Sequence, residues 1–290
     1  DGAAANLSKR LPGSDLRLSP RHGIISGMHV TINGWFAGMT TAGSGQYIDH
    51  MLAHLPQLST DTSFSLLLPR IGGKDVPAGP TYAGIQVEHI PLPRLPRNLA
   101  KLYWEQISVP RAAKRQGADV LWVPYWAAPY WQPTPVVVTV HDLIPSLLPA
   151  YRGGLMQRLY TSLVCTTARR SSQVVAVSAA GAADVVAHLG IPASNVHAVH
   201  HGPNQEDLPR PSPEELVDIR DKYGLPERYF LYLGGFDVRK NVRSILAAYR
   251  RYLDLSGDPT VRLVIAGKLP ADESEFFPNP RRMAEELGRS

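Results

Sequence analysis

The stretch YFLYLGGFDVRKN, residues 229–241, is followed directly by VRSILAAYRRYL, residues 242–253. The apolar and aromatic run that opens this stretch indicates a strand, and Gly234 and Gly235 indicate a turn. Apolar residues then recur at helical spacing. The sequence therefore predicts a strand, a glycine turn and a helix that begins at about Lys240, which is the repeating element of an α/β fold.

The turn after this strand has the composition of an anion-binding site. Backbone N–H groups at the start of a helix are unpaired and carry the positive end of the helix dipole. Glycines let a ligand approach the backbone, and Arg239 and Lys240 add positive charge. Phosphate is the ligand that this combination favours. The alternative is an ordinary corner of an α/β domain with two solvated cations.

Short apolar strands alternate with longer helical patterns along the chain from Met28 onward. Many of these strands are rich in β-branched residues and nearly continuous in hydrophobicity, as buried parallel strands are. After the first strand, apolar residues recur on one helical face behind Ser44, a candidate N-cap. The pattern predicts an α/β fold with a mainly parallel, doubly wound sheet. The predicted strands are residues 28–32, 63–68, 85–90, 120–123, 136–140, 174–177, 196–199, 229–233 and 261–265.

Changes in composition divide the chain into four parts. Residues 1–27 lack the apolar centre of a signal peptide and are rich in Gly, Ser, Pro and Arg, which predicts a flexible leader. Residues 28–204 form the first domain, and residues 205–227 form a proline-rich, charged connector with a short helix near its centre. Residues 228–290 offer about two strands and two helices, which is roughly half of a Rossmann-like domain.

Composition limits the class of protein. With 290 residues, 44% of them hydrophobic, the chain can bury a substantial core. The single cysteine, Cys165, excludes an intrachain disulfide and suits a reducing compartment, so a cytoplasmic protein is expected. No apolar run reaches the roughly 18 residues that a membrane-spanning helix needs.

The net charge of +5 is compatible with phosphate-bearing ligands, an anionic membrane surface or nucleic acid. Nucleic acid is not expected as a partner, because the chain lacks a motif that interleaves basic and aromatic residues. Basic and apolar residues mix at residues 91–117. This mixture suits peripheral contact with the inner face of a membrane, or equally a helix that packs one face on a sheet.

Three loops carry candidate ligand-binding residues. In VVVTVHDLIP, residues 136–145, His141 and Asp142 follow a buried strand, where open α/β sheets place their ligand crevice. A histidine there can donate a hydrogen bond to a sugar or stabilise charge, because its pKa lies near neutrality. Both residues could instead satisfy the loop backbone.

The other two loops give weaker signals. Gly43 and Gly45 lie in GMTTAGSG, residues 38–45, where the backbone could approach a phosphate or a sugar. A flexible turn between strand and helix explains them equally well. His201 follows the strand at residues 196–199 and is a candidate ligand contact, with an ordinary turn residue as the alternative.

Taken in order, these motifs resemble the family 4 glycosyltransferases, which have the GT-B fold. AGSGQY is similar to the family's TG-x-G-x-Y loop, TVHDLIP to T-V-H-D-x-x-P, and GGFDVRKN to GG-x-D-x-RKN. Between them, the passage from VSAAGAAD to HHG follows the order of the segment that closes the family's N-terminal domain. The resemblance implies a Rossmann-like N-terminal, acceptor-side domain and the first part of a second Rossmann-like domain that binds the donor.

The resemblance is strongest to bacterial mannosyltransferases of polysaccharide assembly. It implies transfer of a hexose from a nucleotide diphosphate sugar to a hydroxyl of a glycan or lipid-linked acceptor, and mannose is the hexose expected. The anomeric configuration would be retained. The donor would be GDP-mannose or a UDP-hexose, and no metal or other cofactor would take part. His141 and Asp142 would act at the transferred sugar. The residues implied for the donor diphosphate are Gly43, Gly45, Gly234, Gly235, Arg239 and Lys240.

Two departures from the family pattern qualify this expectation. Many relatives carry an arginine where this chain has Gly235, and the family's E-x7-E segment would lie beyond Ser290. The chain is therefore expected to be a fragment with little or no transferase activity, from a longer protein that is an enzyme. The alternative is a non-catalytic module that binds a sugar or nucleotide, or that partners a complete transferase.

Overall fold

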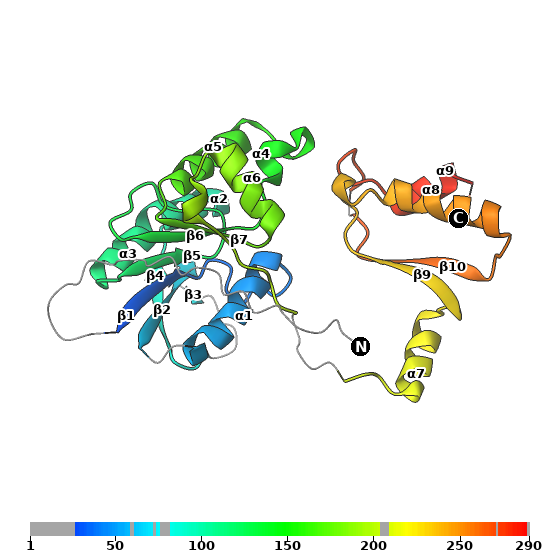
Figure 1. Ribbon diagram of the computed structural model, residues 1–290, viewed down its shortest axis with the longest axis horizontal. Helices are drawn as coiled ribbons and strands as arrows, with labels where there is room; N and C mark the ends of the chain where they lie inside the picture. The colour runs from blue at the N-terminus through cyan, green and yellow to red at the C-terminus, as the bar shows by residue number, and fades with distance from the viewer. Residues whose placement is uncertain are drawn as a thin grey trace, which may run out of the picture. The chain divides into compact units, whose positions relative to one another are not determined.

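The computed structural model describes residues 27–58, 61–71, 74–75, 82–203, 209–270 and 272–288. The chain forms two compact units. Unit 1 consists of Asp1–Leu143 and Leu155–Gly202, and unit 2 consists of Ile144–Gly154 and Pro203–Ser290. Figure 1 shows the elements of both. Apart from Gly27, the predicted leader lies outside the described residues.

A parallel sheet forms the centre of unit 1. In the described part of the unit, seven strands lie parallel in the order β4-β2-β1-β5-β6-β7-β8, and the short β3 pairs antiparallel with the end of β2. This is the strand order of Rossmann folds, with one further strand. The order reverses between β1 and β5, so the ligand crevice is expected at the carboxyl ends of these two strands. The strands are β1 (Met28–Asn33), β2 (Thr62–Ile71), β3 (Lys74–Asp75), β4 (Ile85–Pro91), β5 (Val120–Val123), β6 (Val136–Val140), β7 (Gln173–Ala176) and β8 (Val196–Ala198).

Helices cover both faces of this sheet. Figure 1 shows α1 on one side and α2 and α5 on the other. Sequence signals explain some of the boundaries: α6 begins after Ser178, whose hydroxyl accepts a hydrogen bond from the N–H of Gly181, and ends at the left-handed Gly190. The helices of unit 1 are α1 (Gly43–Leu58), α2 (Arg97–Tyr103), the π-helical turn η1 (Trp104–Ser108), α3 (Val109–Arg115), α5 (Leu155–Arg169), α6 (Ala179–Leu189) and the short η3 (Ala193–Asn195).

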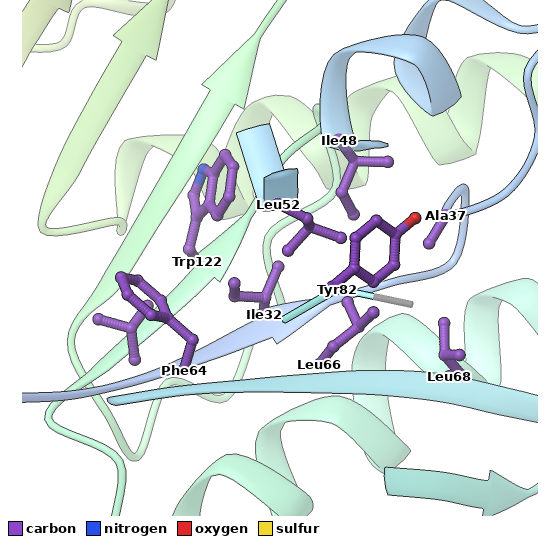
Figure 2. Packing of buried hydrophobic residues seen from close by; sticks show 10 residues of the cluster. Ile32, Ala37, Ile48, Leu52, Phe64, Leu66, Leu68, Tyr82 and Trp122 are labelled. Carbon is purple, nitrogen blue, oxygen red and sulfur yellow. The ribbon is translucent and has the colours of Figure 1, made fainter. Parts of the chain in front are cut away.

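The main core of unit 1 lies between α1 and the sheet. Ile48 and Leu52 of α1 pack against Ile32 of β1 and Leu66 of β2 (Figure 2). Each of these four side chains is at most 1% exposed. Full burial of such a side chain contributes about 1.5–3 kcal/mol, so this contact fixes α1 on the sheet and with it the loop that precedes α1.

Unit 2 contains the parallel pair β9 (Arg228–Leu233) and β10 (Val261–Ala266). Its core joins Phe236 to Val242 and Leu246 of one helix and Met283 of another. The helices of unit 2 are α4 (Ile144–Leu147), η2 (Pro149–Tyr151), α7 (Pro213–Tyr223), η4 (Val238–Lys240), α8 (Val242–Ser256) and α9 (Pro280–Glu286). No helix in the described ranges is both long and apolar enough to cross a lipid bilayer.

The predicted strands are all present, with each end within three residues of its expected place. One predicted helix start is wrong. Ser44 is not an N-cap, because α1 begins at Gly43 and the carbonyl of Ala42 accepts the first helical hydrogen bonds. The helix predicted from about Lys240 is present as α8, which begins two residues later at Val242, because the left-handed Asn241 (φ 48°) separates it from η4.

Candidate functional site

His141 lies at the carboxyl edge of the unit 1 sheet, directly after the buried end of β6. Its Nε2 lies 3.1 Å from the carbonyl oxygen of Pro124, which follows β5. A carbonyl can only accept a hydrogen bond, so Nε2 carries the proton. The neutral ring therefore offers the lone pair of Nδ1 as an acceptor. From its sequence position, His141 is expected to donate a hydrogen bond to a sugar, whereas this tautomer would accept one from a sugar hydroxyl.

Three aromatic rings from distant parts of unit 1 meet at this edge. The ring centroid of Tyr47, on α1, lies 4.9 Å from that of His141, edge to face. His201 stacks on Tyr47 at 4.9 Å, with its centroid 5.8 Å from that of His141. The structure thus brings together two of the predicted site residues. It adds Tyr47, which the sequence analysis placed only within a motif and on a helical face.

This three-ring cluster of Tyr47, His141 and His201 favours uncharged forms of its two half-buried members, Tyr47 and His141. Burial lowers the pKa of His141, although the hydrogen bond with Pro124 opposes this. Burial raises the pKa of Tyr47, partly offset by a hydrogen bond with Thr139. A neutral imidazole and a neutral phenol beside an open edge suit a ligand with hydroxyl groups and C–H faces. Among the described residues, no group of three histidine, cysteine or acidic side chains could hold a metal ion.

Acid should destabilise the protein through His141. Because the pKa of folded His141 is lowered from its ordinary value of 6.5, the unfolded chain binds this proton more readily. The stability that the neutral ring contributes is complete above pH 6.5, the ordinary pKa of histidine, and is lost as the pH falls below this value. Urea denaturation of the wild type and His141→Gln should show the wild type losing more free energy of unfolding between pH 8 and pH 5. A constant difference between the two proteins across this range would contradict the prediction.

The loop between β1 and α1 is held by side chains from outside it. The N–H of Gly38 donates to Asp49 Oδ1 at 2.9 Å, and the Tyr82 hydroxyl donates to the same oxygen at 2.5 Å. Gln46 Nε2 donates to the carbonyl of Thr40 at 2.8 Å. The loop therefore has a defined conformation just before the helix that carries Tyr47.

Gly43 and Gly45 lie in the first turn of α1 rather than in this loop. A Cβ atom at Gly45 would lie 2.1 Å from the carbonyl oxygen of Met39, so close packing of the backbone explains this glycine. No described atom lies within 4 Å of the Cβ position at Gly43. Packing thus leaves the glycine at position 43 unexplained, and contact of either glycine with a donor stays a prediction.

The glycine turn of unit 2 has space beside Gly235 but not beside Gly234, where a Cβ would lie 3.1 Å from the Tyr232 hydroxyl. The N–H of Gly234 donates to the carbonyl of Ala266 at 3.0 Å, which extends the pairing of β9 with β10. A Cβ at Gly235 would have its nearest neighbour, Asp237 Oδ2, at 4.0 Å, and neither glycine has a positive φ. The fold does not require glycine at position 235, which leaves close approach of a ligand as a reason for it.

One of the two predicted cations is already paired within this turn. Arg239 Nε lies 3.5 Å from Asp237 Oδ1, and the Tyr151 hydroxyl donates to the same oxygen. Burial alone would raise the pKa of Asp237, but these two partners hold it below its ordinary value, so the carboxylate is charged. Lys240 is exposed. The turn therefore carries less net positive charge than its RK pair suggested, because Asp237 offsets part of it.

The predicted site residues fall into two groups. His141, His201, Gly43 and Gly45 belong to unit 1, together with the exposed Asp142. Gly234, Gly235, Arg239 and Lys240 belong to unit 2.

The sequence profile of Glycosyltransferase Family 4 matches residues 41–207. This span is more than half of the 290-residue chain and contains the whole three-ring cluster. The chain belongs to Glycosyltransferase Family 4. The family predicted from the loop motifs is therefore confirmed.

Two curated relatives of this family 4 protein are mannosyltransferases from Escherichia coli. The serotype-specific mannosyltransferase WbdA is 27% identical over 160 residues, which cover 54% of this chain and 19% of WbdA. The O-antigen chain mannosyltransferase B is 26% identical over 115 residues, which cover 39% of this chain and 30% of that protein. The chain thus spans about a fifth of the length of the first and less than a third of the second.

A solved structure shares the fold of this family 4 chain. Anabaena Alr3699/HepE, in complex with UDP and glucose, superposes with a TM-score of 0.55 at 15% identity, covering 90% of this chain and 67% of that one. At this identity the likeness shows the fold alone. The predicted fold class, an α/β fold of GT-B type with Rossmann-like architecture, is confirmed.

Proposed function

We propose that this protein is a glycosyltransferase that moves a hexose from a nucleotide diphosphate sugar to a hydroxyl group of a glycan or lipid-linked acceptor. Mannose is the first candidate for this hexose. The configuration at the anomeric carbon is retained. The observation that carries the proposal is the three-ring cluster at the carboxyl edge of the sheet. It lies within a chain segment that matches Glycosyltransferase Family 4. The mannosyltransferase names of two relatives support mannose. The UDP and glucose bound to Alr3699/HepE support a nucleotide sugar donor.

The proposed reaction makes one bond and breaks one. The bond between the anomeric carbon and the diphosphate oxygen breaks, and its electron pair leaves with the diphosphate. The acceptor oxygen bonds to the same face of the anomeric carbon and passes its proton to the departing diphosphate. Nδ1 of neutral His141 accepts a hydrogen bond from a hydroxyl of the transferred sugar, while Arg239 and Lys240 offset the charge that develops on the diphosphate. Within unit 1, Asp142, Gly43 and Gly45 are further proposed ligand contacts, together with His201. Within unit 2, Gly234 and Gly235 are proposed to contact the diphosphate.

We also propose a cytoplasmic location, in which a lipid-linked acceptor would bring the protein to the inner face of a membrane. The basic stretch at residues 91–117 is the proposed contact. Two of its members do not contribute, because Trp104 is fully buried and Lys101 pairs with Glu105 inside unit 1.

Donor binding tests the proposal directly. Sugar nucleotides, GDP-mannose and UDP-glucose first, should raise the melting temperature of the native protein, because a ligand that binds only the folded state stabilises it. Arg239→Gln should weaken this binding about tenfold, since it removes a charge-assisted contact with the diphosphate. Arg228→Gln is the matched control: Arg228 is also an exposed arginine paired with an aspartate, 3.3 Å from Asp258, but lies at the opposite end of β9.

Three outcomes would count against the proposal. If no sugar nucleotide stabilises the protein, it does not bind the proposed donor. If the control variant weakens binding as much as Arg239→Gln, the turn is not the diphosphate site. If sugar nucleotides bind but the full-length protein transfers no sugar to any glycan or lipid-linked acceptor, the protein is a binding module and not an enzyme.

A further inference from the structure

A buried ionic network lies beside the three-ring cluster in unit 1. Glu105 is 0% exposed, and its Oε1 accepts a hydrogen bond from the ammonium of Lys101 at 2.5 Å. The hydroxyl of Tyr160 lies 3.1 and 3.0 Å from the two oxygens of Glu105 and accepts a hydrogen bond from Lys101 at 2.6 Å. Burial and the charge of Glu105 raise the pKa of Tyr160, so its hydroxyl keeps its proton and can donate.

An irregular helix turns this carboxylate inward. Trp104 and Glu105 are neighbours in sequence, and both are fully buried. In a regular α-helix, consecutive side chains point about 100° apart, so burying two large neighbours is unusual for a helix on a sheet. Here both belong to the π-helical turn η1, and π-helical turns occur frequently at functional sites.

The network lies at the switch point of the sheet. Asn33, the last residue of β1, accepts a hydrogen bond from Trp104 Nε1 at 2.7 Å and donates one to the hydroxyl of Tyr125 at 2.9 Å. Tyr125 follows β5 and is the direct neighbour of Pro124, whose carbonyl holds His141. The network and the three-ring cluster are therefore anchored to consecutive residues of one loop, where ligands of open α/β sheets bind.

Lys101 connects the network to the surface. Its side chain is 23% exposed, and its ammonium lies 5.8, 5.2 and 4.8 Å from the ring centroids of Phe36, Tyr125 and Tyr160. Phe36 and Tyr160 are themselves only half-buried. A buried ion pair is often no more stabilising than apolar residues of the same volume, so stability alone does not account for this one.

We propose that Lys101, Glu105 and Tyr160 form a subsite for the ring of a neutral acceptor sugar, at the same edge of the sheet as His141. The inference rests on the proposed function and adds to it the place and chemistry of acceptor binding. Because Glu105 offsets the charge of Lys101, the subsite has little attraction for an anion. One N–H of Lys101 remains beyond those given to Glu105 and Tyr160, and the Tyr160 hydroxyl can still accept a hydrogen bond, so both match sugar hydroxyls. The rings of Phe36 and Tyr160 match the apolar C–H face of a pyranose.

Binding of a simple pyranoside tests the subsite without any enzymatic turnover. Saturation-transfer NMR on the native protein should show methyl α-D-mannopyranoside binding in the millimolar range, and α-D-mannose 1-phosphate binding no more tightly. Tyr160→Phe should weaken binding about tenfold, because it removes one hydrogen bond to a network with charged members. This variant keeps the ion pair between Lys101 and Glu105, so folding should be retained.

Lys101→Met should abolish the binding, and its melting temperature reports whether the unpaired Glu105 disturbs the fold. Lys222→Met is the control, because Lys222 also lies over a tyrosine ring, 5.3 Å from Tyr223, but belongs to unit 2. In transfer assays, Tyr160→Phe should raise KM for the acceptor about tenfold and leave KM for the sugar nucleotide within about twofold.

Four results would overturn the inference: no binding of the pyranoside to the wild type, tighter binding of the phosphate, an equal loss in Lys222→Met, or a rise in KM for the donor instead of the acceptor. Stabilisation by sugar nucleotides separates this failure from failure of the proposed function. If nucleotides stabilise the protein but Tyr160→Phe has normal acceptor constants, only the subsite is wrong. If the pyranoside binds as expected but no nucleotide does, the subsite stands and the proposed function is wrong.

Discussion

Replacing His141 with alanine in the full-length protein should lower kcat about 10²-fold or more. A positioned side chain that exchanges hydrogen bonds or protons with the reacting group contributes about 10²–10⁴-fold to rate. His141 fits this role because it is half-buried at the carboxyl edge of the sheet, and the carbonyl of Pro124 fixes its tautomer. The loss should appear in kcat rather than in KM for the donor, because the interaction strengthens as the sugar departs.

A second variant separates chemistry from folding. In His141→Gln, the side-chain amide can still donate to the carbonyl of Pro124, so the loop should keep its conformation while the imidazole is lost. His197→Ala is the control, since His197 is exposed and hydrogen-bonded to Gln173 at 2.8 Å in the same unit. If His141→Gln folds like the wild type and keeps kcat within about twofold, His141 does not act at the reacting sugar.

The sequence was sufficient for the sheet because the strands of a buried parallel sheet are marked locally. β6 reads VVVTV and is predicted to the residue, since nearly every position of such a strand is apolar. The local strand pattern of β6 also pointed to His141 as a candidate site residue, because ligands bind at the carboxyl ends of buried strands. The start of α8 lies two residues after the expected Lys240, because Asn241 adopts a left-handed conformation. Asparagine tolerates this conformation, but the residue type alone does not predict it.

The contacts within the candidate site could not be predicted, because they join residues far apart in the chain. Tyr47 meets His141 and His201 only after α1 has packed on the sheet. A glutamate such as Glu105 is expected on the solvent-facing side of a helix. From the sequence, the segment that contains it is expected only to contact a membrane or to pack on a sheet. A π-helical turn buries it beside Tyr160, 55 residues away, and no periodicity in the sequence marks such a turn.

Replacing Gly45 with alanine should destabilise the protein by about 2 kcal/mol. Helix propensity alone favours alanine in this first turn of α1 by roughly 1 kcal/mol. The added Cβ, however, would lie 2.1 Å from the carbonyl oxygen of Met39 and 2.9 Å from that of Phe36. Both are backbone atoms of the loop that Asp49 holds, so they cannot move aside cheaply, and the clash should outweigh the gain in propensity.

Thermal and urea unfolding measure this effect, with Gly43→Ala as the matched control. Gly43 lies two residues earlier in the same turn, has no positive φ and has open space at its Cβ position, so this substitution should leave stability unchanged or raise it by up to about 1 kcal/mol. Gly45→Ala should lower the melting temperature by about 2–4 °C for each kcal/mol lost. If Gly45→Ala is as stable as the wild type but binds the sugar nucleotide less tightly, packing is not the reason for this glycine. Approach of the donor to the backbone would then explain it.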